Sequence, residues 1–335
     1  MRTGCRCGRA HRFRAEVDPR SPVHTVSIPA VAPSAQTSIT LAGRPVSRLG
    51  FGAARLTAGD GWGRASDEGE PRRLLRAAID EGYDYVDSAD ALGPGISDEI
   101  IGDVVRPSEK VLVASKVGML RTGPHGWGVL GRPDYLRQQV HATLLRLRRD
   151  QIPLLYLHRI DPAVPLADQW GTLRELRDEG LIGHLGVCEP DLIQLDELVE
   201  IEVPAAVQSL YNIAAPANAV VADRAAELGV PFVAYWALIG RGLARSEYDR
   251  VFRVLGAGGA PFGLSAAQTA LAWALSTRPN GLALVGSRSL RHLAENRRAL
   301  ELRLPDDVTS RLATEVADAL GGVAFDPRRT AEDER

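Results

Sequence analysis

The sequence lacks the features that mark several classes of protein. Its 335 residues carry a formal net charge of −2, and no apolar run approaches the roughly 20 residues that span a bilayer. A charge so close to zero gives no electrostatic reason to expect nucleic acid or an anionic membrane as a partner. We therefore expect a globular protein that acts on a small molecule, and the sequence leaves its oligomeric state open.

Cysteine is also scarce, with three residues: Cys5, Cys7 and Cys188. They cannot all pair, and Cys5 and Cys7 lie too close in sequence to staple a fold. A zinc site that includes His11 would need a fourth ligand and the usual Cys-x-x-Cys spacing, and both are missing. The cysteines therefore predict a protein of the reducing cytoplasm without a metal site.

Residues 1–37 differ in composition from the rest of the chain. Six arginines oppose two acidic residues in the first twenty positions, and a segment rich in Pro, Ser, Ala and Val follows without a clear period. We expect a disordered basic extension. A targeting peptide is one alternative, although no apolar core of signal-peptide length is present, and a translation start placed too far upstream is another. At the other end, residues 321–335 form a polar segment that we interpret as a tail or a partial lid.

Short apolar or β-branched runs alternate with segments of helical period from residue 38 onward. The expected strands are 49–54, 83–88, 111–116, 153–158, 183–188, 205–210, 231–237 and 282–286. The expected helices are 68–82, 97–105, 133–148, 166–179, 191–200, 217–228, 265–277 and 290–301. A short β-hairpin over 39–47, with its turn around Ala42-Gly43-Arg44, precedes the first strand.

Strict alternation of strands and helices predicts an α/β fold with a parallel sheet. Eight units of roughly 30 residues fit a closed (β/α)8 TIM barrel over residues 38–320 better than an open doubly wound sheet. Active sites of such barrels lie at the carboxyl ends of the strands. Polar residues that end strands are therefore the first candidates for function.

Three ionisable residues end three successive expected strands: Asp87, Lys116 and His158. For each residue alone, a solvated ion pair or a hydrogen-bonded core histidine is the more common explanation. Together they favour a site, because a lysine and a carboxylate in a barrel mouth must pair, and their pair can perturb the pKa of a third group beside them.

Several motifs carry a family resemblance. They are Leu49-Gly-Phe-Gly52, Asp87-Ser-Ala-Asp-Ala-Leu-Gly-Pro-Gly-Ile-Ser-Asp-Glu-Ile-Ile-Gly102, Ala114-Ser-Lys116, Leu157-His-Arg159 and Gly286-Ser-Arg-Ser289 with Glu295-Asn296. In order and spacing, over residues 38–320, they resemble the aldo-keto reductase superfamily. The segments 157–162 and 131–136 resemble its bacterial branch that includes pyridoxal reductases.

The resemblance implies a catalytic group in which an aspartate and a lysine lower the pKa of a tyrosine, a histidine orients the carbonyl and NADPH delivers hydride. The matching residues are Asp87, Lys116 and His158, but the tyrosine position holds Leu92. Leucine cannot donate a proton, and loss of a general acid typically costs about 10²- to 10⁴-fold in rate.

The resemblance also implies contacts with the nicotinamide. Gln208 matches a residue that binds the carboxamide, and Tyr235 matches one that stacks on the ring, whereas Cys188 and Glu189 replace a Ser-Asn pair. A thiol is a weak donor and an ionised glutamate only accepts. Cys188 is alternatively a nucleophile or a small apolar filler, and Glu189 a general base or, if desolvated, an acid.

The remaining cofactor contacts look retained. Glycines let backbone N–H groups approach a pyrophosphate, and a helix N-terminus with an arginine suits a 2′-phosphate, which favours NADP over NAD. An isolated surface arginine would be the alternative for Arg288. The implied contacts are Leu238, Gly240 and Gly242 for the pyrophosphate, Ser287 and Arg288 for the 2′-phosphate, and Glu295 and Asn296 for the adenine.

The long loop 117–132 follows Lys116 and is either a lid or a flexible connector. Its Trp127 and His125 are candidate substrate contacts. Three functions fit the sequence. One is an NADPH-dependent reductase of an imine, an iminium or a conjugated alkene. The others are a non-redox enzyme, such as a dehydratase, isomerase or cyclase that uses Glu189, Asp87 or His158, and a catalytically weak cofactor-binding protein.

Overall fold

The computed structural model describes residues 1, 36–59, 61–107, 110–239 and 243–322. The predictions made for most of 1–37 and of 321–335, for Cys5 and Cys7, and for Gly240 and Gly242 fall outside these ranges, so they stay predictions. None of the helices in the described ranges is long and apolar enough to cross a membrane.

Eight parallel strands close into a barrel, which confirms the predicted TIM fold. Each strand begins and ends within two residues of its expected bounds. In barrel order they are β3 (Leu49–Gly52), β4 (Tyr85–Asp87), β5 (Leu112–Val117), β8 (Ile152–Leu157), β9 (Ile182–Cys188), β10 (Ala206–Leu210), β11 (Phe232–Tyr235) and β12 (Gly281–Val285).

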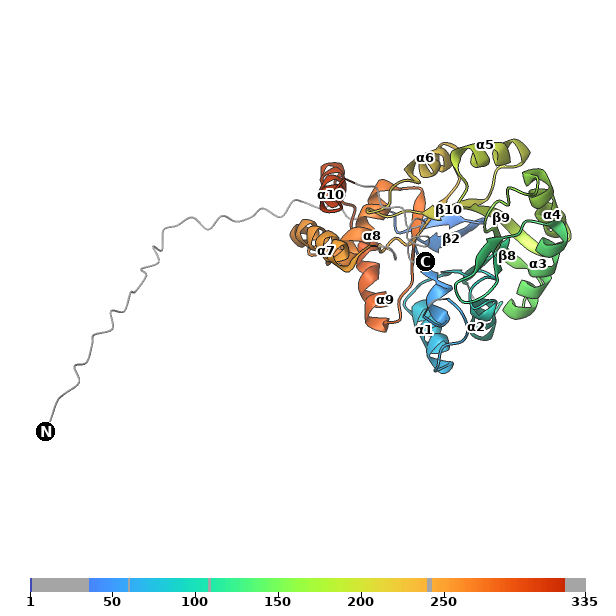
Figure 1. Ribbon diagram of the computed structural model, residues 1–335, viewed down its shortest axis with the longest axis horizontal. Helices are drawn as coiled ribbons and strands as arrows, with labels where there is room; N and C mark the ends of the chain where they lie inside the picture. Colours follow the sequence, from blue (N-terminus) through green and yellow to red (C-terminus); the bar gives the residue numbers. More distant parts are fainter. Residues whose placement is uncertain (2–35, 60, 108–109, 240–242, 323–335) are drawn as a thin grey trace.

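Helices surround the barrel, and Figure 1 shows them as an outer ring seen down the barrel axis. The expected ones are α1 (Gly69–Asp80), α2 (Ile96–Val104), α3 (Pro133–Leu147), α4 (Leu166–Asp178), α5 (Leu192–Ile201), α6 (Ala219–Glu227), α8 (Ala266–Thr277) and α9 (Leu290–Asn296). The last expected helix was too long, because a 3-10 helix, η3 (Arg297–Leu300), replaces its final turn. Another 3-10 helix, η1 (Ala53–Leu56), follows β3.

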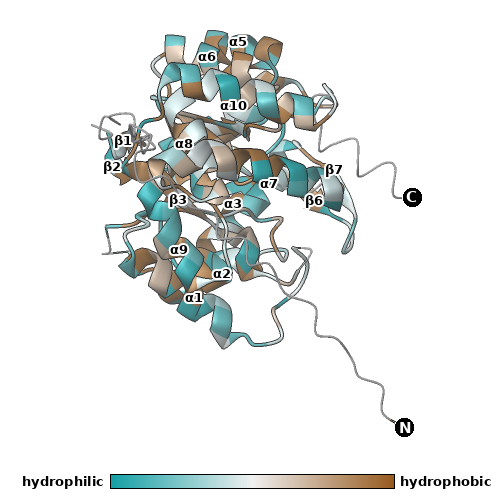
Figure 2. Cartoon of the chain, turned by 90° about the vertical axis from the view of Figure 1, so that its left-hand side faces the viewer, coloured by the Kyte–Doolittle hydropathy of each residue, from teal (hydrophilic) through white to brown (hydrophobic). Residues whose placement is uncertain are grey.

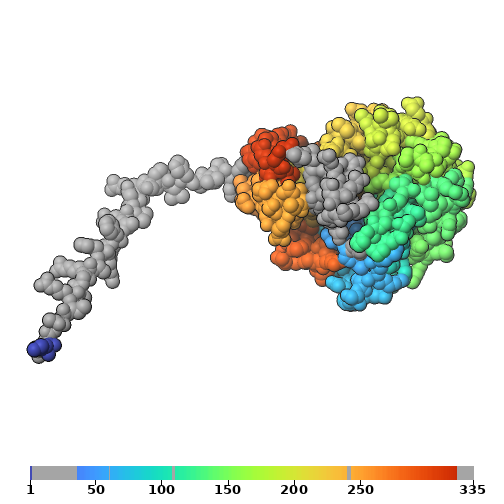
Figure 3. All heavy atoms as spheres, viewed as in Figure 1, coloured from blue at the N-terminus to red at the C-terminus, as the bar shows by residue number. Residues whose placement is uncertain are grey.

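Two helices, α7 (Arg245–Gly259) and α10 (Asp306–Ala319), were not predicted. They lie side by side outside the barrel wall, in orange and red in Figure 3. Glycines at 256, 258 and 259 weaken the helical pattern of α7, because glycine is a poor helix former. Gly258 allows the close approach of α10, since a Cβ there would lie 2.4 Å from the side chain of Leu312 and that side chain would have to shift.

The predicted N-terminal hairpin is present as β1 (Ser38–Leu41) and β2 (Arg44–Ser47). Ala42 and Gly43 form its two-residue turn, both with positive φ (49° and 70°), as a type I′ turn requires. Leu41 and Val46 are buried against inward-facing strand residues, so the hairpin closes the amino-terminal end of the barrel. Figure 2 shows it at the end opposite to β6 (Met119–Arg121) and β7 (Trp127–Val129).

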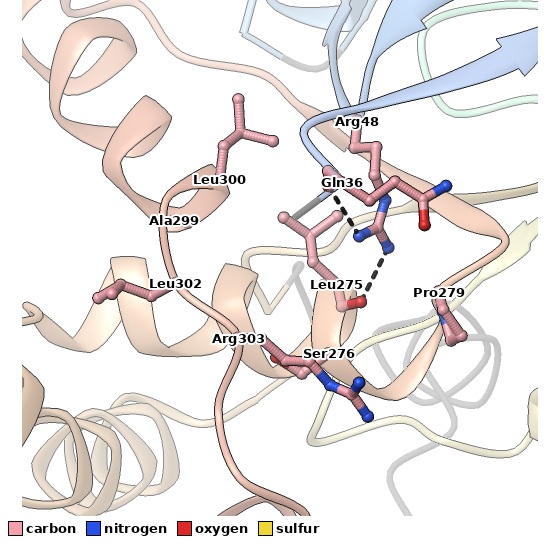
Figure 4. Close-up of a pocket in the computed structure, with 9 residues that line it drawn as sticks. All are labelled: Gln36, Arg48, Leu275, Ser276, Pro279, Ala299, Leu300, Leu302 and Arg303. Carbon is pink, nitrogen blue, oxygen red and sulfur yellow. Dashed lines mark hydrogen bonds between the residues drawn. The ribbon is translucent and has the colours of Figure 1, made fainter. Parts of the chain in front are cut away.

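A cavity of about 160 Å³ also lies at this closed end, and Figure 4 shows its lining. Arg48 beside it donates hydrogen bonds to the carbonyls of Leu275 at 2.8 Å, Arg278 at 2.6 Å and Gly281 at 2.7 Å. The guanidinium therefore satisfies the carbonyl end of α8 rather than facing a ligand. The cavity lies away from the carboxyl ends of the strands, where barrel active sites form.

Candidate active site

The alternation of side chains along the strands directs Asp87, Lys116 and His158 into the barrel mouth. Successive residues of a strand face opposite sides of the sheet. Tyr85, Ala114 and Tyr156 belong to the buried cluster inside the barrel, and each lies two residues before one of the predicted site residues. Asp87, Lys116 and His158 therefore face inward at the carboxyl ends of β4, β5 and β8, which are neighbours in the barrel.

Asp87 and Lys116 form a buried ion pair through Oδ1 and the ammonium group. They are 5% and 4% exposed. Lys116 also donates to the carbonyl of Ser88 at 2.7 Å, and Oδ2 of Asp87 accepts hydrogen bonds from Tyr85 and Gln208, both at 2.9 Å. Because a buried ion pair is stable only when its other hydrogen bonds are satisfied, these contacts hold the pair in place.

Two phenols that were not predicted lie beneath this ion pair. The hydroxyl groups of Tyr85 and Tyr156 are 3.2 Å apart, and neither residue is exposed. Burial and the charge of Asp87 raise the pKa of both well above the usual value. Neither hydroxyl reaches solvent, so neither is placed to give a proton to a substrate. The sequence did contain a signal for these tyrosines, because each lies two residues before a predicted site residue and therefore faces the same side of the sheet.

His158 is held as a neutral imidazole. Burial and the positive charges of Arg159 and Lys116 lower its pKa well below the usual value. Within the described part of the chain, Nδ1 is buried and has no hydrogen-bond partner. A neutral imidazole carries one N–H donor, which is what orienting a substrate oxygen or nitrogen requires.

Leu92 lies in the turn after β4, close to the end of β5. The turn is tied to that strand by a hydrogen bond of 3.0 Å from the amide of Asp90 to the carbonyl of Lys116. Leu92 is partly exposed, and in the described ranges it belongs to neither buried apolar cluster. The side chain is therefore at the rim of the mouth rather than in the core.

The loop after Lys116 contains an unpredicted hairpin, β6–β7, held by Arg121. The guanidinium carbon lies 5.1 Å from the ring centre of Trp62 and 3.8 Å from that of Trp127. Its Nη1 donates to the carbonyls of Gly61 and Ala91, both at 3.2 Å. The hairpin is thus tied to the turn that carries Leu92. Trp127 is 49% exposed, so part of its surface stays open to solvent.

His125, the other candidate substrate contact, is exposed between β6 and β7. The substrate roles of Trp127 and His125 stay predictions.

A buried acidic pair behind the Leu92 turn was also missed. Asp98 of α2 accepts a hydrogen bond of 3.0 Å from Ser115 and is fully buried, and burial raises its pKa to about 6. Burial and the charge of Asp98 raise the pKa of Asp90 well above its usual range. Among the residues that the structure describes, neither carboxylate oxygen of Asp90 has a hydrogen-bond partner.

The residues expected to bind a carboxamide have other partners. Gln208 donates to Asp87 and is 2% exposed, so its amide nitrogen is engaged inside the barrel. Cys188 is 1% exposed, and burial raises its thiol pKa to about 11, which favours a filler over a nucleophile. Glu189 has φ 55° and accepts a hydrogen bond of 2.5 Å from the amide of Leu210.

Arg159 also lies at the barrel mouth, although the sequence did not single it out. Its Nη1 donates to the carbonyl of His158 at 2.7 Å and contacts the sulfur of Cys188 at 3.3 Å. The motif Leu157-His-Arg159 was visible in the sequence. Arg159 follows the end of β8, where strand alternation no longer indicates the direction of a side chain.

The residues expected to bind the 2′-phosphate make hydrogen bonds within the protein. Ser287 is buried, and its hydroxyl accepts from the amide of Ser289 at 3.0 Å. Arg288 is exposed and donates to the carbonyl of Thr57 at 3.2 Å. Ser289 caps α9 by accepting from the amide of His292 at 3.4 Å.

The expected adenine and pyrophosphate contacts differ in exposure. Glu295 is exposed and pairs with Arg291 at 3.2 Å, whereas Asn296 is only 4% exposed and Leu238 is partly buried. All three roles stay predictions.

Comparison with known proteins gives a consistent result. The model of the aldo/keto reductase family matches residues 48–315. An uncharacterised oxidoreductase of Schizosaccharomyces pombe is 31% identical over 312 residues, which cover 93% of this chain and 98% of that protein. Pyridoxine 4-dehydrogenase of Escherichia coli is 30% identical over 288 residues, which cover 82% and 96%.

A solved structure has the same fold. The aldo-keto reductase of Klebsiella pneumoniae in complex with NADPH aligns with a TM-score of 0.70 and 24% identity, over 83% of this chain and 94% of that one. Because the family model spans most of the sequence and two relatives are at least 30% identical over more than two thirds of it, the chain is an oxidoreductase of the aldo/keto reductase family.

Proposed function

We propose that the protein is an NADP(H)-dependent reductase of an imine, an iminium or a conjugated alkene, rather than of a simple carbonyl. One observation carries this proposal. Asp87, Lys116 and a neutral His158 stand at three adjacent strand ends, while the turn beside them presents Leu92 where the resemblance places a tyrosine. The groups that polarise a substrate are retained without the usual phenol.

Arg288 supports the choice of cofactor. It is exposed after β12, and among the described residues it donates one hydrogen bond, to the carbonyl of Thr57, so its other N–H groups suit a 2′-phosphate. Ser287 contributes less, because its hydroxyl already bonds Ser289. The NADPH complex of the Klebsiella pneumoniae relative supports the same cofactor. When bound, NADPH supplies a hydride.

His158 and Lys116 act on the substrate. The neutral imidazole of His158 can donate its N–H to a heteroatom of the substrate. Lys116 has three N–H groups, of which Asp87 and Ser88 accept two. Its third N–H and its charge can stabilise negative charge that develops on the substrate.

The absence of a phenol then selects the substrate. Hydride addition to an iminium carbon gives a neutral amine, so no proton is needed. An imine takes a proton from water and reacts as the iminium. Hydride addition to the β carbon of a conjugated alkene gives an enolate, whose oxygen His158 and Lys116 can stabilise, and the α carbon then takes a proton from water. A simple carbonyl becomes an alkoxide that needs a proton, and Leu92 has none to give.

The similarity to pyridoxine 4-dehydrogenase supports a relation to the branch that acts on pyridoxal-like compounds. The cytoplasmic location expected from the sequence stays a prediction.

Two measurements test the proposal. We expect NADPH to bind with nanomolar to micromolar affinity, and no binding at high micromolar cofactor would overturn it. A panel of aldehydes, cyclic imines and enones, followed by NADPH absorbance, should then give turnover of imines or enones above that of aldehydes. Aldehydes as the best substrates would refute the role that we give to Leu92.

The same measurements separate the alternatives. Binding of NADPH without turnover of any class would support a cofactor-binding protein. Conversion of a substrate without NADPH consumption would support a non-redox enzyme, and Glu189→Gln should then abolish that conversion. The Glu189 carboxylate is already held by the amide of Leu210, which favours a positioning role over proton transfer.

A further inference from the structure

A bound nicotinamide carboxamide requires a hydrogen-bond donor for its oxygen and a hydrogen-bond acceptor for its NH2 group. The three residues that match the family's carboxamide contacts offer no free strong donor. The amide nitrogen of Gln208 donates to Asp87, the thiol of Cys188 is buried and is a weak donor, and an ionised Glu189 only accepts. A donor must therefore come from elsewhere in the mouth.

Arg159 can provide that donor. Its side chain extends from the end of β8 to the sulfur of Cys188, 3.3 Å away, at the end of the neighbouring β9. A guanidinium has five N–H donors, and only Nη1 makes protein hydrogen bonds among the described residues. Arg159 is partly exposed and forms no ion pair with a described carboxylate, so it stays available to a ligand.

Glu189 provides the acceptor on the same side of the mouth. Its positive φ turns the side chain toward β10, where Oε1 accepts from the amide of Leu210 at 2.5 Å and from Nδ2 of Asn218 at 3.5 Å. A carboxylate has about four acceptor positions, so others remain. Leu210 pairs in register with Tyr235, which brings the carboxylate next to that ring.

The charges of Arg159 and Glu189 both act on the phenol of Tyr235. Burial raises the pKa of Tyr235 well above its usual value, the charge of Glu189 raises it further, and the charge of Arg159 opposes that rise. One aromatic ring is thus within reach of both charges. Figure 1 shows β8, β9 and β10, which bring these groups together, side by side in the barrel wall.

We infer that Arg159 and Glu189 together bind the carboxamide of the nicotinamide, Arg159 donating to its oxygen and Glu189 accepting from its NH2 group. This inference rests on the proposed use of NADP(H). It gives the altered Cys188-Glu189 segment a binding role, because Arg159 reaches the carboxamide site past the small cysteine. It also frees Gln208 to hold Asp87.

Binding measurements on the full chain test this inference. NADPH and 2′,5′-ADP, which has the adenine and 2′-phosphate but no nicotinamide, are titrated by calorimetry into the wild type and into Arg159→Met. Loss of a charged hydrogen bond should weaken NADPH binding by about 10- to 100-fold, while 2′,5′-ADP binding stays within about two-fold. Unchanged 2′,5′-ADP binding also reports that the variant is folded.

Two further variants sharpen the result. Arg288→Met, at the phosphate end, should weaken both ligands to a similar extent. Glu189→Leu should repeat the pattern of Arg159→Met. Arg159→Met that binds NADPH like the wild type would overturn the inference while the proposed function stands. A wild type that binds neither ligand would overturn the proposed function, and this inference with it.

Discussion

The hydroxyl of Tyr85 donates a hydrogen bond to Oδ2 of Asp87 at 2.9 Å, while Oδ1 of the same carboxylate pairs with the ammonium of Lys116. Tyr85 lies two residues before Asp87 in β4, toward the closed end of the barrel. The site therefore has a phenol next to its carboxylate, but on the side away from the mouth. There it acts as a ligand of Asp87 and cannot replace a proton donor.

This arrangement predicts the behaviour of Tyr85→Phe. Asp87 would lose one buried donor, so the free energy of unfolding should fall by about 1–3 kcal/mol in urea denaturation. Turnover should fall as well, because Asp87 holds Lys116. Tyr83→Phe is the matched control, since its buried hydroxyl donates to the carbonyl of Leu293 at 3.0 Å, outside the site. It should lose similar stability and keep turnover, and equal losses of turnover in both variants would contradict the prediction.

Leu92→Tyr should convert the site toward carbonyl reduction. A phenol at this rim position would give the alkoxide a proton, so aldehyde turnover should rise by about 10²- to 10⁴-fold. Leu92→Phe supplies the ring without the hydroxyl and should leave aldehyde turnover low. The measurement is NADPH consumption with a series of aldehydes. Aldehyde turnover that is equal in the wild type and Leu92→Tyr would show that the leucine does not limit the reaction.

Arg121→Met should loosen the β6–β7 hairpin. The guanidinium contacts two tryptophan rings, and each such contact contributes about 0.5–1 kcal/mol when exposed and more when desolvated. We expect KM for the substrate to rise by about 10-fold, with a smaller change in kcat. Tryptophan fluorescence should change, because Trp62 and Trp127 lose the cation. Arg132→Met, whose partner is the exposed Asp134, is the control that should change neither quantity.

The strands and most helices were predictable because local patterns determine them. The run 111–116 is apolar until its last two residues, and a buried parallel strand requires that pattern. Asp87, Lys116 and His158 were found by the same logic, since strand ends define the mouth of a barrel. The helix α7 was missed because glycine is a poor helix former, and the packing of Gly258 against Leu312 cannot be read from the sequence.

The side-chain network of the mouth was not predictable. Gln208 matched a cofactor contact, yet the fold places Asp87 within 2.9 Å of its amide nitrogen, and that proximity arises between strands 121 residues apart. Arg159 was overlooked because a residue just after a strand has no fixed direction. Sequence motifs identify which residues reach the mouth, but hydrogen bonds between strands decide which of them stay free for a ligand.

Asp98 should make stability depend on pH. Its pKa in the folded protein is about 6 against an ordinary 3.8, because of burial. The folded state therefore holds this proton more tightly, and the resulting stability is present below about pH 4 and is lost as the pH rises through 6. The loss amounts to at most about 3 kcal/mol.

Asp98→Asn keeps an oxygen that can accept from Ser115, at 3.0 Å in the native protein, and removes the charge. Urea denaturation should show the variant more stable than the wild type at pH 7.5 and nearly equal to it at pH 4. The comparison of the two proteins cancels other titrating groups, so a stability difference that is the same at both pH values would contradict the raised pKa.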